Sequence, residues 1–106
     1  MHQYEQEIKN ITERIIEEEK PEKIILFGSY ATSMTTKDSD VDLFIVKKTT
    51  ESSRERRLNL RRKLFGIKVP MDILIYTPSE VQIRLDLNDL FIKDIVNNGK
   101  LLYERK

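Results

Sequence analysis

Apolar residues near the start of the chain recur with the period of a helix. Their spacings of four, three and four residues predict an amphipathic helix over residues 3–19. Pro21 lacks the backbone N–H that a continuing helix needs, so the helix should end before it. The positions that define the apolar face are Tyr4, Ile8, Ile11 and Ile15.

Three short runs rich in β-branched and apolar residues predict strands. They read KIILF at 23–27, VDLFIV at 41–46 and VPMDILIY at 69–76. Gly28 bounds the first run and the polar stretch TTKDS precedes the second, as expected for strands that end in turns.

The intervening segments predict further helices. One or two helical turns are expected at 29–34, and a helix over 51–66 that ends at Gly66. Thr77 and Glu80 form a capping-box pattern around Pro78, and this start signal predicts helical structure to Asn97 with a break near 86–88. After Gly99, the run LLYE at 101–104 predicts a short edge strand. The order αβαβαβα indicates an α/β or α+β fold, with residues 1–106 forming one domain.

Composition narrows the functional classes. Lys and Arg number 19 against 18 Asp and Glu, so the net charge of +1 gives no global argument for a nucleic-acid or membrane partner. The chain has no cysteine, which excludes disulfides and thiolate metal sites. No apolar run reaches the roughly 20 residues of a membrane span, and MHQYEQEIKN does not resemble a signal peptide. We therefore expect a cytoplasmic protein.

Three aspartates stand beside apolar strand residues. Side chains two apart on a strand share a face, so Asp40 and Asp42 should project together while Val41 and Leu43 point the other way. Asp72 repeats the anomaly within a run that should form a core strand. Three converging carboxylates would repel one another unless cations neutralised them, and oxygen ligands suit Mg²⁺ or Mn²⁺. Two such ions about 3.5–4 Å apart form the clamp used in nucleotidyl transfer.

Gly28 and Ser29 complete the pattern. Glycine lets the backbone pass close to a ligand, and the N–H groups at a helix start favour phosphate. A phosphate-binding turn, a pair of metal ligands and a third carboxylate one helix later suit an enzyme acting on nucleoside triphosphates.

These motifs, Gly28-Ser29, then Ser39-Asp40-Val41-Asp42-Leu43, then Asp72, resemble the signature of the DNA polymerase β-type nucleotidyltransferase superfamily. The small size is similar to its minimal nucleotidyltransferase branch. The resemblance implies a small mixed sheet flanked by helices. It also implies that Asp40 and Asp42 bind two Mg²⁺ ions, that Asp72 binds the catalytic ion and activates the acceptor hydroxyl, and that Gly28 and Ser29 hold the triphosphate of ATP.

The same resemblance implies an activity and a partner. Minimal nucleotidyltransferases pair with helical HEPN proteins, and in several pairs they act as antitoxins that transfer AMP to a tyrosine of the toxin. Many members read GS-x-A-R-G, whereas Thr32-Ser33 replaces the arginine and glycine here. The alternative is therefore a catalytically faded nucleotide-binding module that neutralises its partner by stoichiometric binding. A homodimer or hetero-oligomer would cover an exposed sheet edge.

Other charged and aromatic residues have plainer interpretations. The basic run over 54–63 is read chiefly as the solvated face of a helix, with an RNA or protein surface as the alternative. Residues Glu17, Glu18 and Glu19 are expected to face solvent. Tyr30 could contact a base, but packing in the core is the favoured interpretation.

Overall fold

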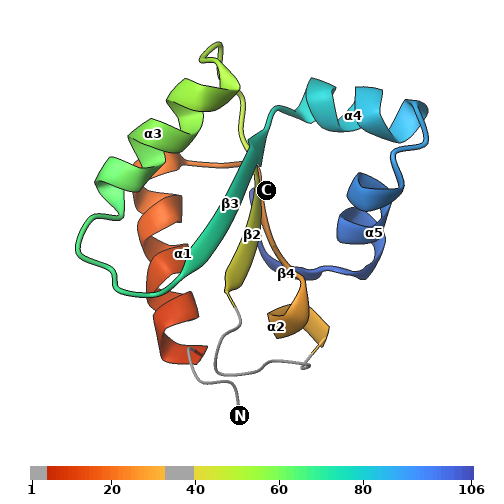
Figure 1. Ribbon diagram of the computed structural model, residues 1–106. Helices are drawn as coiled ribbons and strands as arrows, with labels where there is room; N and C mark the ends of the chain where they lie inside the picture. The colour runs from red at the N-terminus through yellow and green to blue at the C-terminus, as the bar shows by residue number, and fades with distance from the viewer. Residues whose placement is uncertain (1–4, 33–39) are drawn as a thin grey trace.

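The computed structural model describes residues 5–32 and 40–106, and they form a four-stranded sheet with helices on both faces (Figure 1). The strand order is β3-β2-β1-β4. β1 runs antiparallel to both of its neighbours, whereas β2 and β3 are parallel. This is the mixed sheet that the sequence predicts. The elements in chain order are α1 (Glu5–Glu19), β1 (Lys23–Phe27), α2 (Ser29–Thr32), β2 (Val41–Val46), α3 (Ser53–Lys63), β3 (Met71–Tyr76), α4 (Pro78–Asp86), α5 (Leu90–Asn98) and β4 (Lys100–Glu104).

Helices α1 and α3 cover one face of the sheet, and α4 and α5 cover the other (Figure 1). The central strand β2 divides its side chains between them, as its period of two requires. Val41, Leu43 and Ile45 enter the core on the α1 and α3 side. Phe44 and Val46 enter the core on the α4 and α5 side. The two cores leave β2 buried along nearly its whole length.

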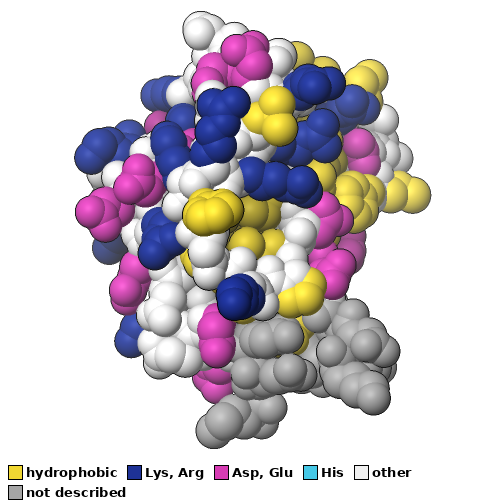
Figure 2. Space-filling model, turned by 60° about the vertical axis from the view of Figure 1, so that its left-hand side comes forward, with side chains coloured by type: hydrophobic (Ala, Val, Ile, Leu, Met, Phe, Trp, Pro, Cys, Tyr) yellow, Lys and Arg dark blue, Asp and Glu magenta, His cyan; other side chains and the backbone are white. Residues whose placement is uncertain are grey.

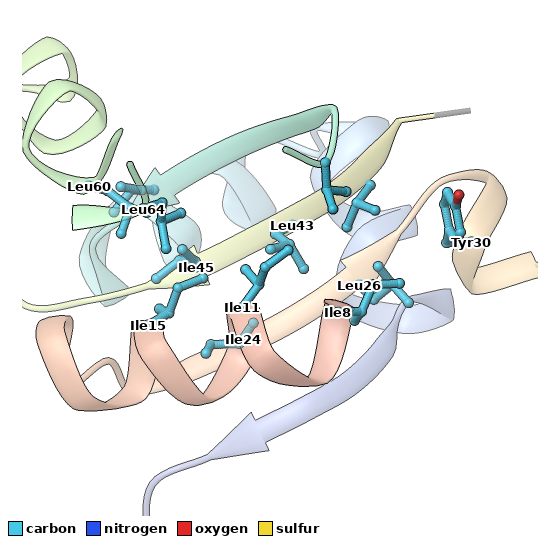
Figure 3. Packing of buried hydrophobic residues seen from close by; sticks show 13 residues of the cluster. Ile8, Ile11, Ile15, Ile24, Leu26, Tyr30, Leu43, Ile45, Leu60 and Leu64 are labelled. Carbon is cyan, nitrogen blue, oxygen red and sulfur yellow. The ribbon is translucent and has the colours of Figure 1, made fainter. Parts of the chain in front are cut away.

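The predicted apolar face of the first helix forms the centre of the larger core (Figure 3). Ile11 and Ile15 have no exposed surface, and each such side chain contributes about 1.5–3 kcal/mol when it is fully buried. Leu60 and Leu64 meet this layer from α3. Tyr30 packs into the same cluster with 2% of its surface exposed, so the packing interpretation is confirmed.

Capping residues set several element boundaries. Ser52 and Thr77 each cap a helix with a complete capping box, so α3 begins at Ser53 rather than at 51. The predicted break after α4 is present, where Asn88 adopts a positive φ of 60°. β3 begins at Met71 rather than at 69. The predicted helical residues 3–4 and 33–34, and the polar loop 35–39, lie outside the described residues.

Glu19 departs from the expectation that the glutamate run faces solvent. It is buried, and its carboxylate accepts hydrogen bonds from Lys47 Nζ at 2.8 Å and Lys63 Nζ at 2.5 Å. Burial raises the pKa of Glu19, but the two lysines outweigh it and hold that pKa below its ordinary value. These contacts tie the end of α1 to the ends of β2 and α3. The glutamate run therefore contains one structural residue.

Arg56 likewise departs from the expected solvated face of α3. Its guanidinium is buried and donates two hydrogen bonds to Glu80, at 2.6 and 3.2 Å. Further bonds reach the carbonyl oxygens of Glu51 at 2.8 Å and Ile75 at 3.3 Å. The planar fork thus connects α3, β3 and the start of α4, which a single ammonium could not do in the same geometry.

Candidate active site

Gly28 joins β1 to α2 and lies directly against Asp42. Its φ of +73° is a conformation that side chains other than glycine rarely adopt. A Cβ at this position would lie 2.2 Å from Asp42 Oδ2, closer than real Cβ contacts, and 3.1 Å from Asp42 Cγ. Only glycine therefore lets the backbone pass beside this carboxylate.

Residues of the short helix α2 donate hydrogen bonds to the carbonyl oxygen of Gly28. The Ala31 and Thr32 backbone N–H groups donate to Gly28 O at 3.1 and 3.3 Å. The Thr32 hydroxyl also lies within hydrogen-bond distance of Gly28 O, at 3.4 Å, and of Ser29 O, at 3.2 Å. Ser29 is half-buried at the start of this turn, one residue from the Asp42 carboxylate contact. Gly28 and Ser29 thus border the acidic site, as a phosphate-binding turn must.

Asp42 and Asp72 are direct neighbours across the sheet. The parallel register pairs Asp42 with Asp72, and the antiparallel register pairs Asp42 with Phe27. Paired residues project to the same face, and adjacent strands lie about 4.8 Å apart. The three side chains therefore form a row on the α4 and α5 side of the sheet. The alternation predicted for Val41 and Leu43, on the opposite face, is confirmed.

The charges of the three aspartates interact. Burial raises the pKa of Asp42, and the negative charges of Asp72 and Asp40 raise it further. Asp40 is exposed and lies directly before β2. Within residues 5–32 and 40–106, none of the ion pairs involves these carboxylates. Among the described residues, this cluster of negative charge therefore has no ion-paired basic side chain.

The structure corrects the environment expected for Asp72. The sequence places it in a core strand, but β3 is an edge strand and Asp72 is exposed. In the described sheet β3 pairs with β2 alone, and the Asp72 side chain, near the N-terminal end of the strand, is exposed. The feature that marks Asp72 as a candidate site residue is therefore its pairing with Asp42 across the sheet, and not burial.

A metal ion would suit the chemistry of this donor set. Carboxylate oxygens are the ligands that Mg²⁺ and Mn²⁺ prefer. A divalent cation would relieve the repulsion from Asp72 and Asp40 that adds to the effect of burial in raising the pKa of Asp42. As the side chains stand, no group of three His, Cys, Asp or Glu in the described part of the chain is arranged around a common metal position. Asp42 and Asp72 are aligned across the sheet, and Asp40 directly precedes β2; metal binding by these three residues stays a prediction.

An aromatic pair adjoins the row and was not anticipated from the sequence. The rings of Phe27 and Phe91 meet edge to face, with centroids 5.8 Å apart at 83°. Phe91 remains 54% exposed. The two residues are far apart in the chain, and their contact depends on how α5 docks on β1. No spacing in the sequence could have indicated it.

Comparisons with known proteins identify the family and the fold of this chain. Residues 7–106 match the family described as Polymerase beta, Nucleotidyltransferase. The match covers nearly the whole chain, so the protein belongs to this nucleotidyltransferase family. No curated protein matches the sequence. No helix among the described residues is long and apolar enough to cross a membrane.

Two solved structures share the fold. A candidate nucleotidyltransferase from Sulfolobus solfataricus superimposes with a TM-score of 0.65 at 22% identity, covering 94% of this chain and 79% of that one. A toxin-antitoxin structure with AMP-PNP gives a TM-score of 0.64 at 20% identity, covering 92% of this chain and 74% of that one. At these identities the likeness establishes the polymerase β-like fold.

Proposed function

We propose that this protein is a Mg²⁺-dependent nucleotidyltransferase that moves AMP from ATP to a hydroxyl group of a partner protein. The observation that carries the proposal is the alignment of Asp42 with Asp72 beside Gly28, where burial and then the negative charges of Asp72 and Asp40 raise the pKa of Asp42. A stable fold gains nothing from such repulsion, whereas a metal-dependent site requires it. Family membership supports the same chemistry.

Each residue has a distinct role in the proposed reaction. Asp40 and Asp42 would hold two Mg²⁺ ions, and Asp72 would share one of them and orient the acceptor hydroxyl. The ions supply charge neutralisation and a lowered pKa for that hydroxyl. Gly28 and Ser29 would border the triphosphate. The hydroxyl oxygen attacks the α-phosphorus of ATP, the bond to the bridging oxygen breaks, and pyrophosphate leaves while the hydroxyl proton passes to Asp72 or to water.

The acceptor is proposed to be a tyrosine of a HEPN toxin, which would make this protein its antitoxin. Support comes from the resemblance to minimal nucleotidyltransferases and from the fold shared with a toxin-antitoxin structure that contains AMP-PNP, an analogue of ATP.

Intact-mass analysis tests the proposal directly. The protein is co-expressed with the product of the adjacent gene and incubated with ATP and Mg²⁺. We expect the neighbour to gain the mass of one or more AMP units, and we expect no gain with Asp72→Asn. Equal gain with Asp72→Asn would reject the proposed site, and no gain on any neighbour would reject the proposed acceptor.

A second function is supported by the environment of Thr32. Where many relatives carry arginine, this hydroxyl turns back to the carbonyl groups of Gly28 and Ser29 and offers no positive charge to a phosphate. The protein could then neutralise its partner by binding alone. Asp40→Asn separates the two functions, because it should abolish neutralisation by AMP transfer and leave neutralisation by binding intact.

A further inference from the structure

The outer edge of β3 is partly sealed. β2 is the only strand paired with β3 in the described sheet. Arg56 Nη1 donates to the carbonyl oxygen of Ile75 at 3.3 Å, so this part of the edge is already occupied. Backbone groups two residues apart on a strand point the same way, so Met71 and Ile73 turn their N–H and C=O groups to the same open side. The sealed half lies away from Asp72, and the open half includes it.

A hollow of about 250 Å³ lies beside the open half of β3. Its floor is apolar, with Leu60 and Leu64 of α3 facing Met71 and Ile73 of β3. Arg57 and Arg61 also line it, and Asp72 borders it. The same hollow is therefore lined by two arginines and by Asp72, the residue proposed to orient the acceptor hydroxyl.

The two arginines are available to a ligand. Both are exposed, and neither forms an ion pair within the described ranges. Figure 2 shows Lys and Arg side chains gathered on this face around exposed hydrophobic side chains. A second hollow, of about 290 Å³, continues along β3 and is lined by Arg57 and Arg84. Glu80 also lines it, but its charge is paired with Arg56.

We propose that an extended acidic segment of the acceptor protein binds along the open half of β3 as an additional strand. The inference rests on the proposed function and names the recognition mode of the acceptor. Main-chain bonds to Met71 and Ile73 would provide affinity, and Arg57 and Arg61 would pair with carboxylates of the segment. Side chains of the added strand alternate between the two faces of the sheet. A residue whose side chain enters the hollow is therefore adjacent in sequence to one that points toward Asp42 and Asp72, and this second residue carries the hydroxyl.

The observations favour a peptide over RNA. Single-stranded RNA binds through aromatic rings on which its bases stack, together with positive charge. The hollow that contains Asp72 is lined by aliphatic side chains, Met71 and two arginines, with no aromatic ring among its lining residues. An open strand edge, by contrast, matches the main chain of a peptide.

Peptide binding without ATP tests the charge pairing. The probe is a fluorescein-labelled peptide of about ten residues, the length of a long strand, with one tyrosine flanked by valine and glutamate. We expect Arg57→Glu with Arg61→Glu to weaken binding by about tenfold or more, measured by fluorescence anisotropy. Lys9→Glu with Arg14→Glu makes the same charge change on the exposed face of α1 and should leave affinity within about threefold. Equal affinity for the wild type and the first variant would overturn the inference.

Backbone methylation of the peptide tests the strand pairing without altering the protein. One peptide carries N-methyl groups on its odd residues and a second on its even residues. We expect one of the two to lose binding and the other to retain it, because only alternate N–H groups face β3. Equal binding by both, or tighter binding of oligouridine than of the peptide through the same arginines, would overturn the inference. Since ATP is absent, these outcomes are independent of whether AMP transfer occurs.

Discussion

A carboxylate lies near each end of β2, and the two have opposite electrostatic environments. At the C-terminal end, Glu19 of α1 lies buried between Lys47 and Lys63, which hold its pKa below the ordinary value in spite of burial. At the N-terminal end, Asp42 lies beside Asp72 with no basic partner among the described residues, and its pKa is raised by burial and by like charge. The negative charge of the carboxylate is therefore neutralised by two lysines at the C-terminal end of β2, the balanced end. At the N-terminal end, the unbalanced end, it lies beside a second negative charge.

This difference separates stability from function along a single strand. Burying a carboxylate between two ammonium groups fixes how α1, β2 and α3 pack, and removing one partner of such a group is costly. Leaving two aspartates side by side weakens the fold locally, and the proposed metal site would account for this arrangement. Substitution of Asp42 should therefore lower activity and slightly raise the free energy of unfolding, whereas substitution of Glu19 should lower the free energy of unfolding.

The largest expected effect is at the unbalanced end. Asp42→Asn should reduce AMP transfer by about 10³-fold or more, because it removes a metal ligand and a charge on which the proposed transition state depends. The rate of label transfer from ATP to the partner measures this. Asp86→Asn, which neutralises an exposed aspartate on α4, should leave the rate within about twofold. Full activity in Asp42→Asn would remove the basis for calling this end functional.

At the balanced end, Glu19→Gln should lower the free energy of unfolding by about 2–4 kcal/mol, since it leaves Lys47 and Lys63 without their shared counter-charge. Urea denaturation followed by circular dichroism measures the change. Glu17→Gln, at an exposed position of the same helix, should alter stability by less than about 0.5 kcal/mol. If the two variants are equally stable, Glu19 is not the structural residue that its contacts indicate.

The sequence predicted the strand and face of Asp42 better than it predicted the environment of Glu19. Asp42 and Asp72 stand out because each interrupts an apolar strand, and strand alternation alone gives the face of Asp42. Their alignment needs the parallel pairing of β2 with β3, which spacing along the chain does not specify. Glu19 lies four residues after Ile15, so helical spacing separates its face from that of Glu17, but spacing does not show which groups meet its carboxylate. It is buried only because α1 docks against β2 and α3, and that depends on packing between distant segments.

Arg56 shows the same limit and offers a third test. It lies in a basic run whose neighbours are exposed, yet its guanidinium makes four hydrogen bonds, two of them to Glu80. Arg56→Lys keeps the charge but loses the planar fork, and should cost about 1–2 kcal/mol of stability. Arg57→Lys, one residue on and exposed, should cost less than about 0.5 kcal/mol. Thermal unfolding of the two variants measures this difference in stability. Because both variants keep the positive charge, a larger loss in Arg56→Lys reports the hydrogen-bond geometry of its guanidinium.

The smallest expected effect distinguishes the two carboxylates by the sign of their pH dependence. The pKa of Asp42 is raised in the fold, so its ionisation destabilises the protein as pH rises through that value. Asp42→Asn should therefore be more stable than the wild type at pH 7, by less than about 1 kcal/mol, and this gain should vanish below the ordinary carboxyl pKa of 3.8.

For Glu19 the stability difference between variant and wild type should have the opposite sign. Its pKa is lowered in the fold, so its stabilisation is complete above the ordinary carboxyl pKa of 4.5 and is lost as pH falls through the lowered value. The advantage of the wild type over Glu19→Gln should therefore shrink with acidification, as the gain of Asp42→Asn does for the opposite reason. Urea midpoints of the three proteins across pH 3–7 measure both trends. A gain of Asp42→Asn that grew toward acid pH would show that its carboxylate is stabilised by a partner, and the contrast between the two ends of β2 would then fail.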